Sequence, residues 1–591
     1  MKKLIVFLFL AISIWACNTK PATTIAAANK ELAKMLDAYY EERLQLFPLE
    51  ATSNGDNRYN DKLYADFTDD YRAKLKTFYS KYASEIDKFK RDDLNSNDKI
   101  SYDVFKREMQ MSLKGLTFKD NLTPLNQFYG RHLDMGQLGS GDGNQPFKTF
   151  EDYTHWIQRA TAFSVWADSA IVYFRKGMNE NYVLPKALVV KIIPQCKDVI
   201  VDDVTKSLFW GPMNKIPASF NSNDKTQLTI AYTNLVKNVL NPAYQKLANF
   251  FEKEYLPKAR TSSGISSNPT GSDYYKYLIE QWTTTNKTPD EIYAKGLEEV
   301  KRILGEMEKV KAEVKYNGDL KSFFEFMKND KQFMPYKTPE EVIAAFKNIQ
   351  STIDPNLKKM FGNTPKTRFE IRQTEAFRAA SASAEYNQSS EDGTRPGIFY
   401  IPIIDATKFN TTSGMESLFL HEAIPGHHYQ ISLQQENKEL PKFRRFSWYG
   451  AYGEGWALYC ESLGKELGLY TNPYQYMGAL GDEIHRAIRL VVDVALHTKN
   501  MTREEAIKYM MENEAISEQG ATAEIERYMA IPAQALSYKT GALKIKELRE
   551  KYTTQQGASF SLKAYHDELL KDGCLPLDVL EGKMNDWAKK N

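Results

Sequence analysis

Cysteine is scarce in this chain, with 4 residues in 591. Cys196, Cys460 and Cys574 lie far apart and are odd in number, which argues against a disulfide framework. The sequence has no Cys-x-x-Cys pair, so a cysteine-based metal knot is not expected either. Cys460 stands in a stretch with apolar periodicity and is predicted to be a small buried residue.

An excess of charge of one sign is also missing. The 78 basic and 76 acidic side chains give a formal net charge of +2, and no long run of one sign occurs. Nucleic acids and anionic membranes are recognised by concentrated basic residues. We therefore expect no nucleic-acid partner, and the composition leaves the oligomeric state open.

Long hydrophobic runs are absent except at the start of the chain. Met1-Lys2-Lys3 is followed by an almost wholly apolar stretch over residues 4–16. This stretch is too short to span a bilayer as a stable anchor, so residues 1–16 are predicted to be a secretory signal. No second apolar span follows, and the rest of the chain is expected to be exported.

The segment Ile14-Trp15-Ala16-Cys17 resembles a bacterial lipobox, in which the cysteine is lipidated and becomes the first residue. Trp15 is an unusual residue there, and the alternative is an ordinary signal followed by an incidental cysteine. Residues 17–29 are predicted to be a lipidated polar tether. We expect an exported lipoprotein of the bacterial envelope, on the periplasmic side or at the outer membrane, anchored by a lipid on Cys17.

Most of the chain has helical patterns. Three segments start with a Thr cap and place Glu three residues later, which is the capping-box signature. They begin at Thr288, Thr338 and Thr502, and residues 27–46 and 64–89 have helical apolar spacing. The Ser-, Gly-, Pro- and Asn-rich stretch 261–270 is a candidate boundary. It would separate an N-terminal helical part (30–260) from a C-terminal catalytic part (271–591), both packed as one unit.

Strand signals are few. Residues 367–372 alternate in polarity, which suits a half-buried strand, and residues 397–403 form a second β-rich run. Pro402 in the second run predicts an edge strand. Edge strands bind extended peptides through main-chain hydrogen bonds, so this strand is expected to align a substrate.

The densest chemistry lies in His421-Glu422-Ala423-Ile424-Pro425-Gly426-His427-His428, which contains three of the eight histidines. A catalytic zinc ion takes imidazole and carboxylate ligands and keeps one position for water. A nearby carboxylate removes the proton of that water as it attacks a carbonyl group. His421 is therefore predicted to bind zinc and Glu422 to act as the general base.

The second histidine ligand is less clear, because Pro425 replaces the histidine of the familiar His-Glu-x-x-His pattern. On a straight helix His427 would be rotated about 600° from His421 and would point well away from it. His428 would lie close to the same face but about 10 Å further along the axis. Pro425 and Gly426 permit a bulge that returns His427 to the metal. We favour His427 over His428. The alternative is a Pro-Gly turn whose histidines only cap two helices.

A third ligand is expected from Tyr452-Gly453-Glu454-Gly455-Trp456, where a carboxylate stands at the start of a helical run. Glu454 is the predicted ligand. Glu461 lies seven residues later on the same helical face, and it is either an alternative ligand or a supporting group.

Two further clusters are candidates for supporting roles. Asp493 and His497 are one helical turn apart, and Asp493 is a candidate partner for a ligand histidine. Amide hydrolysis builds negative charge on the carbonyl oxygen, which a Tyr hydroxyl or an Arg side chain can stabilise. Tyr538 is the first choice for this role, followed by Arg527 and Tyr528.

These blocks, in this order, resemble a large family of bacterial lipoproteins known as domain of unknown function 885. They are His-Glu-x-x-Pro-Gly-His-His, Glu-Gly-Trp-Ala-x-Tyr-x-Glu, Arg-Tyr and Pro-x-Gln-Ala-Leu-Ser-Tyr-Lys. The plan is similar to that of helical zinc peptidases with a glutamate ligand, such as the thimet oligopeptidase, angiotensin-converting enzyme and thermostable carboxypeptidase families. The likeness to those peptidases covers His421, Glu422 and Glu454.

The resemblance implies a mainly α fold, with a large helical shell around a deep cleft and a small β-sheet next to the metal-binding helix. The expected activity is zinc-dependent hydrolysis of short peptides, with Arg395 meeting a carboxylate terminus and Tyr400 near the substrate. One alternative is a metal-dependent hydrolase of non-peptide amides or esters. Another is a non-catalytic envelope protein that binds peptides. Peptide length and exo- or endo-cleavage stay open.

Overall fold

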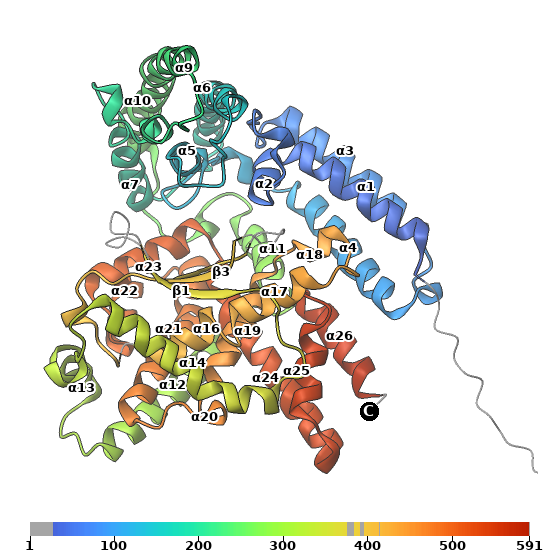
Figure 1. The fold of residues 1–591 in the computed structure, drawn as a ribbon, viewed down its shortest axis with the longest axis vertical. Helices are drawn as coiled ribbons and strands as arrows, with labels where there is room; N and C mark the ends of the chain where they lie inside the picture. The colour runs from blue at the N-terminus through green and yellow to red at the C-terminus, as the bar shows by residue number, and fades with distance from the viewer. Residues whose placement is uncertain (1–27, 375–382, 390–394, 413, 590–591) are drawn as a thin grey trace, which may run out of the picture.

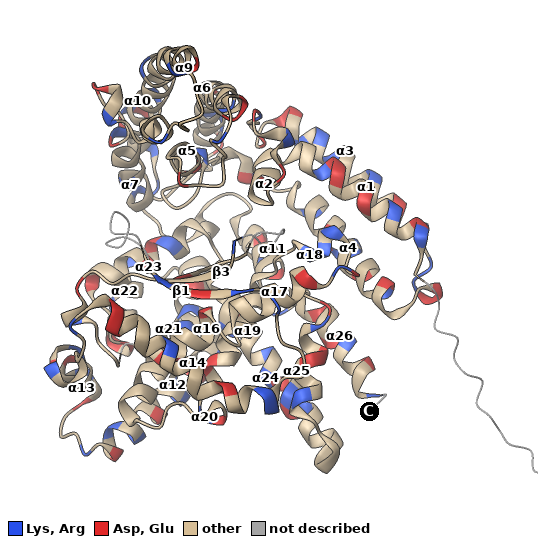
Figure 2. Cartoon of the chain, viewed as in Figure 1, with Lys and Arg blue, Asp and Glu red and all other residues tan. Residues whose placement is uncertain are grey.

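The computed structural model describes residues 28–374, 383–389, 395–412 and 414–589, and it is mainly α-helical, as the sequence predicts (Figure 1). The predicted signal segment and Cys17 lie outside these residues. Within the described ranges, no helix combines the length and the apolar character needed to cross a membrane. Figure 2 shows basic and acidic residues interspersed along the helices in this view.

The N-terminal part contains ten α-helices in the described residues: α1 (Lys30–Leu46), α2 (Pro48–Ser53), α3 (Asp69–Ile86), α4 (Ser96–Gly115), α5 (Arg131–Gly139), α6 (Phe150–Asn179), α7 (Lys186–Lys197), α8 (Gly211–Asn214), α9 (Ser222–Leu235) and α10 (Asn241–Phe250). Helices α6, α7, α9 and α10 enclose a core of their own, which includes Trp156, Phe163 and Trp166. Helices α1, α3 and α4 instead share a core with the C-terminal part, where Phe105 packs edge-on against Phe443. The N-terminal part is therefore not a single packing unit.

The C-terminal part carries the remaining helices: α11 (Gly271–Thr283), α12 (Pro289–Glu313), α13 (Leu320–Asn329), α14 (Pro339–Met360), α16 (Met415–Glu422), α17 (His427–Glu436), α18 (Lys442–Arg445), α19 (Gly450–Ser462), α20 (Gly464–Leu467), α21 (Pro473–Thr498), α22 (Arg503–Asn513), α23 (Glu518–Ala530), α24 (Ser537–Gln556), α25 (Leu562–Leu570) and α26 (Leu577–Ala588). Complete capping boxes start α12 at Thr288 and α22 at Thr502. Thr338 caps α14 through the Glu341 amide, while the Glu341 carboxylate accepts from the Lys337 amide instead. The capping signals therefore located all three helix starts.

The sheet has three strands in the described residues, β1 (Phe369–Gln373), β2 (Glu385–Asn387) and β3 (Gly397–Ile401), in the order β1-β3-β2. β3 runs parallel to β1 and antiparallel to β2. The prediction of an edge strand at residues 397–403 is wrong, because β3 is central. Pro402 follows the last residue of the strand, so its missing N–H removes no hydrogen bond from the ladder.

Strand β2 pairs with β3 on the side opposite β1, and it is a short strand that the sequence gives no reason to expect. The sheet lies between the N-terminal helices and the body of the C-terminal part (Figure 1). Phe399 of β3 packs against Phe346 of α14 and Phe419 of α16, with ring centroids 5.5 and 6.5 Å apart. This packing places the sheet beside the helix that carries His421.

Candidate metal centre

The helix that begins at Met415 stops at Glu422, and a new helix begins at His427. The segment between them contains a cis Ile424–Pro425 peptide bond, and the indole Nε1 of Trp456 donates to the Pro425 carbonyl at 2.8 Å. A Cβ on Gly426 would lie 1.9 Å from the His421 carbonyl oxygen, so only glycine fits this turn. The expected bend at Pro-Gly is present.

The bend brings two imidazoles to one carboxylate. Nε2 of His421 and Nε2 of His427 lie 3.5 and 3.4 Å from Oε2 of Glu454 on α19. The two rings are perpendicular, with centroids 4.8 Å apart. One N or O atom from each of the three residues lies within 4.8 Å of the others. We call these three residues the His-His-Glu cluster.

Gly455, directly after Glu454, allows close helix packing. A Cβ on Gly455 would lie 2.6 Å from the Gly541 backbone, and a Cβ on Gly541 would lie 1.7 Å from the Ala451 carbonyl oxygen. Helices α19 and α24 therefore cross with their backbones in contact. This crossing brings Glu454 and Tyr538, near the start of α24, to the same cavity.

Glu461, on the same helix as Glu454, orients one of the two histidines. Nδ1 of His421 donates a hydrogen bond to Glu461 Oε1 at 2.7 Å, and both side chains are buried. In a neutral His421 this bond leaves the lone pair on Nε2, the atom that faces Glu454. A carboxylate that holds a histidine in this way is typical of zinc sites. Glu461 thus occupies the position that the sequence analysis offered to Asp493.

The charges around the cluster favour a cation. Burial lowers the pKa of His421, but hydrogen bonds to Glu454 and Glu461 outweigh it and hold this pKa well above its usual value. Burial raises the pKa of Glu454, but the charge on His427 and hydrogen bonds to both histidines outweigh it and keep this pKa below its usual range. When both imidazoles are neutral, their lone pairs and those of a carboxylate converge here, and this donor set fits zinc.

His428 points away from the cluster. Its Nδ1 lies 3.0 Å from the Tyr386 hydroxyl of β2 and 3.3 Å from Ser432 Oγ. Its ring packs against Phe369, and burial lowers its pKa to about 4. Of the two histidines that the sequence left open, His427 therefore meets Glu454, whereas His428 holds strand β2.

The cluster lies in a cavity of about 470 Å³, which we call the cluster cavity. Glu422 and Tyr538 also line it, so the predicted base and the first-choice oxyanion donor share this space. Part of its wall is strand β2 and the residue before it. Its lining residues are Ala384, Glu385, Tyr386, His421, Glu422, His427, Ile431, Trp448, Glu454, Arg486, Arg489 and Tyr538.

The structure does not bring Arg527 into this cavity. Its Nη2 donates to Gln534 at 2.9 Å, and its guanidinium lies over the Phe128 ring. Tyr528 is buried behind the wall, where its hydroxyl donates to Glu524 at 2.6 Å and accepts from Arg489 Nε at 3.0 Å. Tyr528 thus supports a wall residue and does not face the cluster cavity.

Asp493 and His497 belong to the protein core. Asp493 accepts hydrogen bonds from the Tyr275 hydroxyl at 2.6 Å and from the Ala533 amide, and burial raises its pKa to about 7. His497 accepts from the Ile265 amide at 3.0 Å and donates to the Tyr528 carbonyl at 3.1 Å. Both side chains fasten α21 to neighbouring segments and do not line the cluster cavity.

The two candidates near the sheet also lie outside the cavity wall. Arg395 is exposed and donates to the Gln388 carbonyl at 3.0 Å. Tyr400 pairs in register with Arg372 of β1 and with Glu385 of β2. Neither is among the residues that line the cluster cavity.

Two arginines of the cavity wall, Arg486 and Arg489, were missed by the sequence analysis. They lie one turn apart on α21. Helical spacing within the Asp482–Arg489 segment placed both on one face, so the signal was present. Tyr386 was also missed, because a strand of three residues carries no detectable periodicity.

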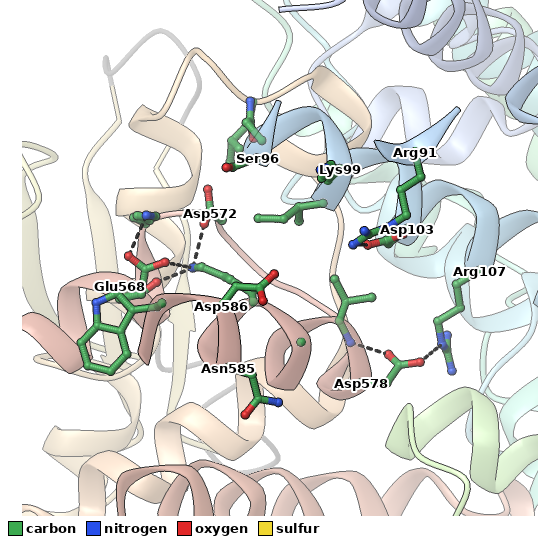
Figure 3. A pocket seen from close by; sticks show the side chains of 18 of the residues that line it. Arg91, Ser96, Lys99, Asp103, Arg107, Glu568, Asp572, Asp578, Asn585 and Asp586 are labelled. Atoms are coloured by element: carbon green, nitrogen blue, oxygen red, sulfur yellow. Dashed lines mark hydrogen bonds and ion pairs between the residues drawn. The ribbon is translucent and has the colours of Figure 1, made fainter. Parts of the chain in front are cut away.

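A larger cavity, of about 1330 Å³, lies elsewhere, between α4, α25 and α26 (Figure 3). Its charged side chains are largely matched in pairs. Lys583 lies 2.8 Å from Asp572, Arg91 lies 2.6 Å from Asp103, and Arg107 lies 3.7 Å from Asp578. Because these charges neutralise one another, we do not regard this cavity as the functional site.

Comparison with known proteins adds a family and a fold. A sequence profile described as "Bacterial protein of unknown function (DUF885)" matches residues 48–584. The chain is similar to the solved structure of a candidate lipoprotein from Colwellia psychrerythraea, with 29% identity, a TM-score of 0.87, and coverage of 95% of this chain and 99% of that one. A candidate lipoprotein of unknown function from Shewanella oneidensis shares the fold, with 19% identity, a TM-score of 0.73, and coverage of 95% and 100%. Among curated proteins, none matches the chain.

Proposed function

The chain belongs to the bacterial protein family DUF885, and we propose from the cluster cavity that it is a zinc-dependent peptidase that hydrolyses short peptides. One observation carries this proposal. Nε2 of His421, Nε2 of His427 and a carboxylate oxygen of Glu454 converge in a cavity that also contains Glu422. Two imidazoles and one carboxylate are a common ligand set of catalytic zinc.

A zinc ion held by this cluster would supply a Lewis acid for the attack of water on a peptide carbonyl. The chain's own groups provide the proton transfers. Glu422 takes a proton from the attacking water and delivers it to the amine nitrogen as the C–N bond breaks. The Tyr538 hydroxyl donates a hydrogen bond to the carbonyl oxygen, on which negative charge develops.

The position of strand β2 favours an extended peptide over a compact molecule as the substrate. It is the strand at the end of the β1-β3-β2 order in the described residues, and Glu385 and Tyr386 line the cluster cavity. An extended peptide would add to such an edge through main-chain hydrogen bonds. His428 acts indirectly in this scheme, because it holds the Tyr386 hydroxyl.

We further propose that the chain is a lipoprotein of the bacterial envelope, anchored through Cys17. The lipobox-like segment Ile14–Cys17 supports this, as do the candidate lipoproteins of similar fold. Replacement of Cys17 by Ala would move the exported protein from the membrane fraction to the soluble fraction. Retention of this variant in the membrane fraction would argue against a lipid at Cys17.

Two measurements test the peptidase proposal. Elemental analysis of the purified protein is expected to give about one zinc per chain. A pooled library of short peptides, analysed by mass spectrometry, is expected to be cleaved by the parent and not by Glu422→Gln, which should keep its zinc. Equal cleavage by both would refute the role of Glu422. Acyl amides and esters serve as parallel substrates, and exclusive turnover of these would favour a non-peptide hydrolase.

A further inference from the structure

The wall of the cluster cavity contains two basic side chains that the proposed hydrolysis does not use. Arg486 and Arg489 both line this cavity and lie one turn apart on α21. The Arg489 side chain is 7% exposed, so its charge is almost fully withdrawn from bulk water. Charged groups are rarely buried unless they are paired or serve a ligand.

A hydrogen-bond network fixes the Arg489 guanidinium. Its Nε donates to the Tyr528 hydroxyl at 3.0 Å, and its Nη2 lies 3.1 Å from Glu524 and 3.0 Å from His485 Nε2. The Tyr538 ring, which also lines the cavity, lies 4.8 Å from the guanidinium carbon. These contacts hold one nitrogen-bearing edge of Arg489 in place against the protein.

The remaining nitrogen of this guanidinium is not used. Nη1 of Arg489 is buried and has no hydrogen-bond partner among the residues that the structure describes. Nε of Arg486 is in the same state, although Nη1 of Arg486 donates to the Asp482 carbonyl and carboxylate at 3.1 and 3.2 Å. A buried donor left without a partner is costly, so two such donors in one cavity wall indicate a ligand that accepts from them.

We propose that Arg486 and Arg489 bind the C-terminal carboxylate of the substrate, which makes the protein a carboxypeptidase. This inference rests on the proposed peptidase function. A guanidinium matches a planar carboxylate in shape and charge. The cavity also holds Glu385, Glu422 and Glu454, which would repel a dianion such as a phosphate more strongly than a single carboxylate.

The geometry also limits where the substrate is cut. Both arginines and the His-His-Glu cluster line one cavity of about 470 Å³, which leaves room for a short segment between them. If the terminal carboxylate is held at the arginines, the carbonyl that reaches the cluster belongs to a bond near the end of the peptide. The protein is therefore expected to remove single residues or very short fragments from the C-terminus of its substrate.

The first experiment compares N-acetylated tripeptides that carry either a free C-terminal carboxylate or a C-terminal amide. The parent is expected to cleave the acids with a kcat/KM roughly 10- to 100-fold higher than the amides, the range of a charge-assisted hydrogen bond. Arg489→Met should remove the preference, so that this variant cleaves acids and amides with similar kcat/KM, and Arg489→Lys should keep a smaller preference than the parent. Arg175→Met is the matched control, because Arg175 lies outside the cavity and pairs with Glu254, and it should behave as the parent.

The second experiment measures binding without turnover. Calorimetric titration of Glu422→Gln with the same peptides should give an acid Kd about tenfold or more below the amide Kd. Melting temperatures report whether each variant is folded. If Arg489→Met does not fold, the inference is tested by the acid-to-amide ratio of kcat/KM in the parent and in Arg489→Lys.

Equal kcat/KM for acids and amides in the parent would overturn the inference and leave the peptidase intact. A loss that affects both forms equally in Arg489→Met would assign Arg489 to the carbonyl oxygen and would also overturn it. If neither form is cleaved, the proposed function fails, and the calorimetric comparison alone then decides whether the arginines select a carboxylate.

Discussion

His421 donates its Nδ1 hydrogen to Glu461 at 2.7 Å, while its Nε2 lies 3.5 Å from Glu454. The two glutamates lie on α19, so a single helix supplies both the third member of the cluster and the group that orients the first. This arrangement predicts that replacing Glu461 has a different effect on zinc binding from replacing Glu454.

We expect Glu461→Gln to keep the fold but to lower zinc affinity about 10- to 100-fold, since the orienting carboxylate raises the basicity of His421. Competition with a chromophoric chelator measures this affinity. Glu466→Gln is the control, because Glu466 lies near the same helix but pairs with Arg549. An unchanged affinity in Glu461→Gln would contradict the role given to the hydrogen bond.

Replacing each histidine of the 421–428 segment by Ala separates the ligands from their neighbour. His421→Ala and His427→Ala should each lose stoichiometric zinc, as should Glu454→Ala. His428→Ala should keep zinc but weaken peptide binding, because the Tyr386 hydroxyl of β2 loses its partner. Elemental analysis and KM measure the two effects. Loss of zinc in His428→Ala with retention in His427→Ala would reverse the assignment.

Gly426→Ala tests the bend itself. The added Cβ would lie 1.9 Å from the His421 carbonyl oxygen, so the backbone must shift and the two histidines must separate. We expect a loss of more than about 2 kcal/mol in the free energy of unfolding, together with loss of zinc. Gly305→Ala is the control, because a Cβ there has open space and should stabilise helix α12 by about 0.5–1 kcal/mol. Urea unfolding distinguishes the two.

The buried His566 predicts a loss of stability in acid. Its Nδ1 donates to the Met360 carbonyl at 2.9 Å, and its Nε2 accepts from the Tyr459 hydroxyl at 2.8 Å. Burial lowers its pKa to about 3, so the folded protein keeps this ring neutral while the unfolded chain takes up a proton near pH 6.5. The unfolded state therefore binds more protons, and stability falls as pH falls from about 6.5 towards 3.

The size of this effect is on the order of 3 kcal/mol between pH 7 and pH 4. Urea unfolding of the parent and of His566→Gln over this pH range isolates it, because Gln cannot titrate. The gap in unfolding free energy between the two should narrow by that amount as the pH falls. Parallel stability curves would show that His566 does not resist protonation.

The sequence by itself determined the features that depend on neighbouring residues. Capping boxes located the starts of α12 and α22, because such a cap is satisfied within one helical turn. Pro425 and Gly426 fixed the bend between His421 and His427, because proline lacks a backbone donor and glycine has no Cβ. The order of the motif blocks indicated the family to which the chain belongs.

Only the tertiary structure decided which of these side chains meet. His427 rather than His428 faces Glu454 because α19 packs across the bend, where the Trp456 indole donates to the Pro425 carbonyl. β3 became central because β2, a strand too short to show a pattern, pairs with it. Arg489 entered the cavity wall, and Arg527 did not, through contacts between segments far apart in the chain. Local sequence patterns cannot encode such contacts, because they arise from how whole helices pack.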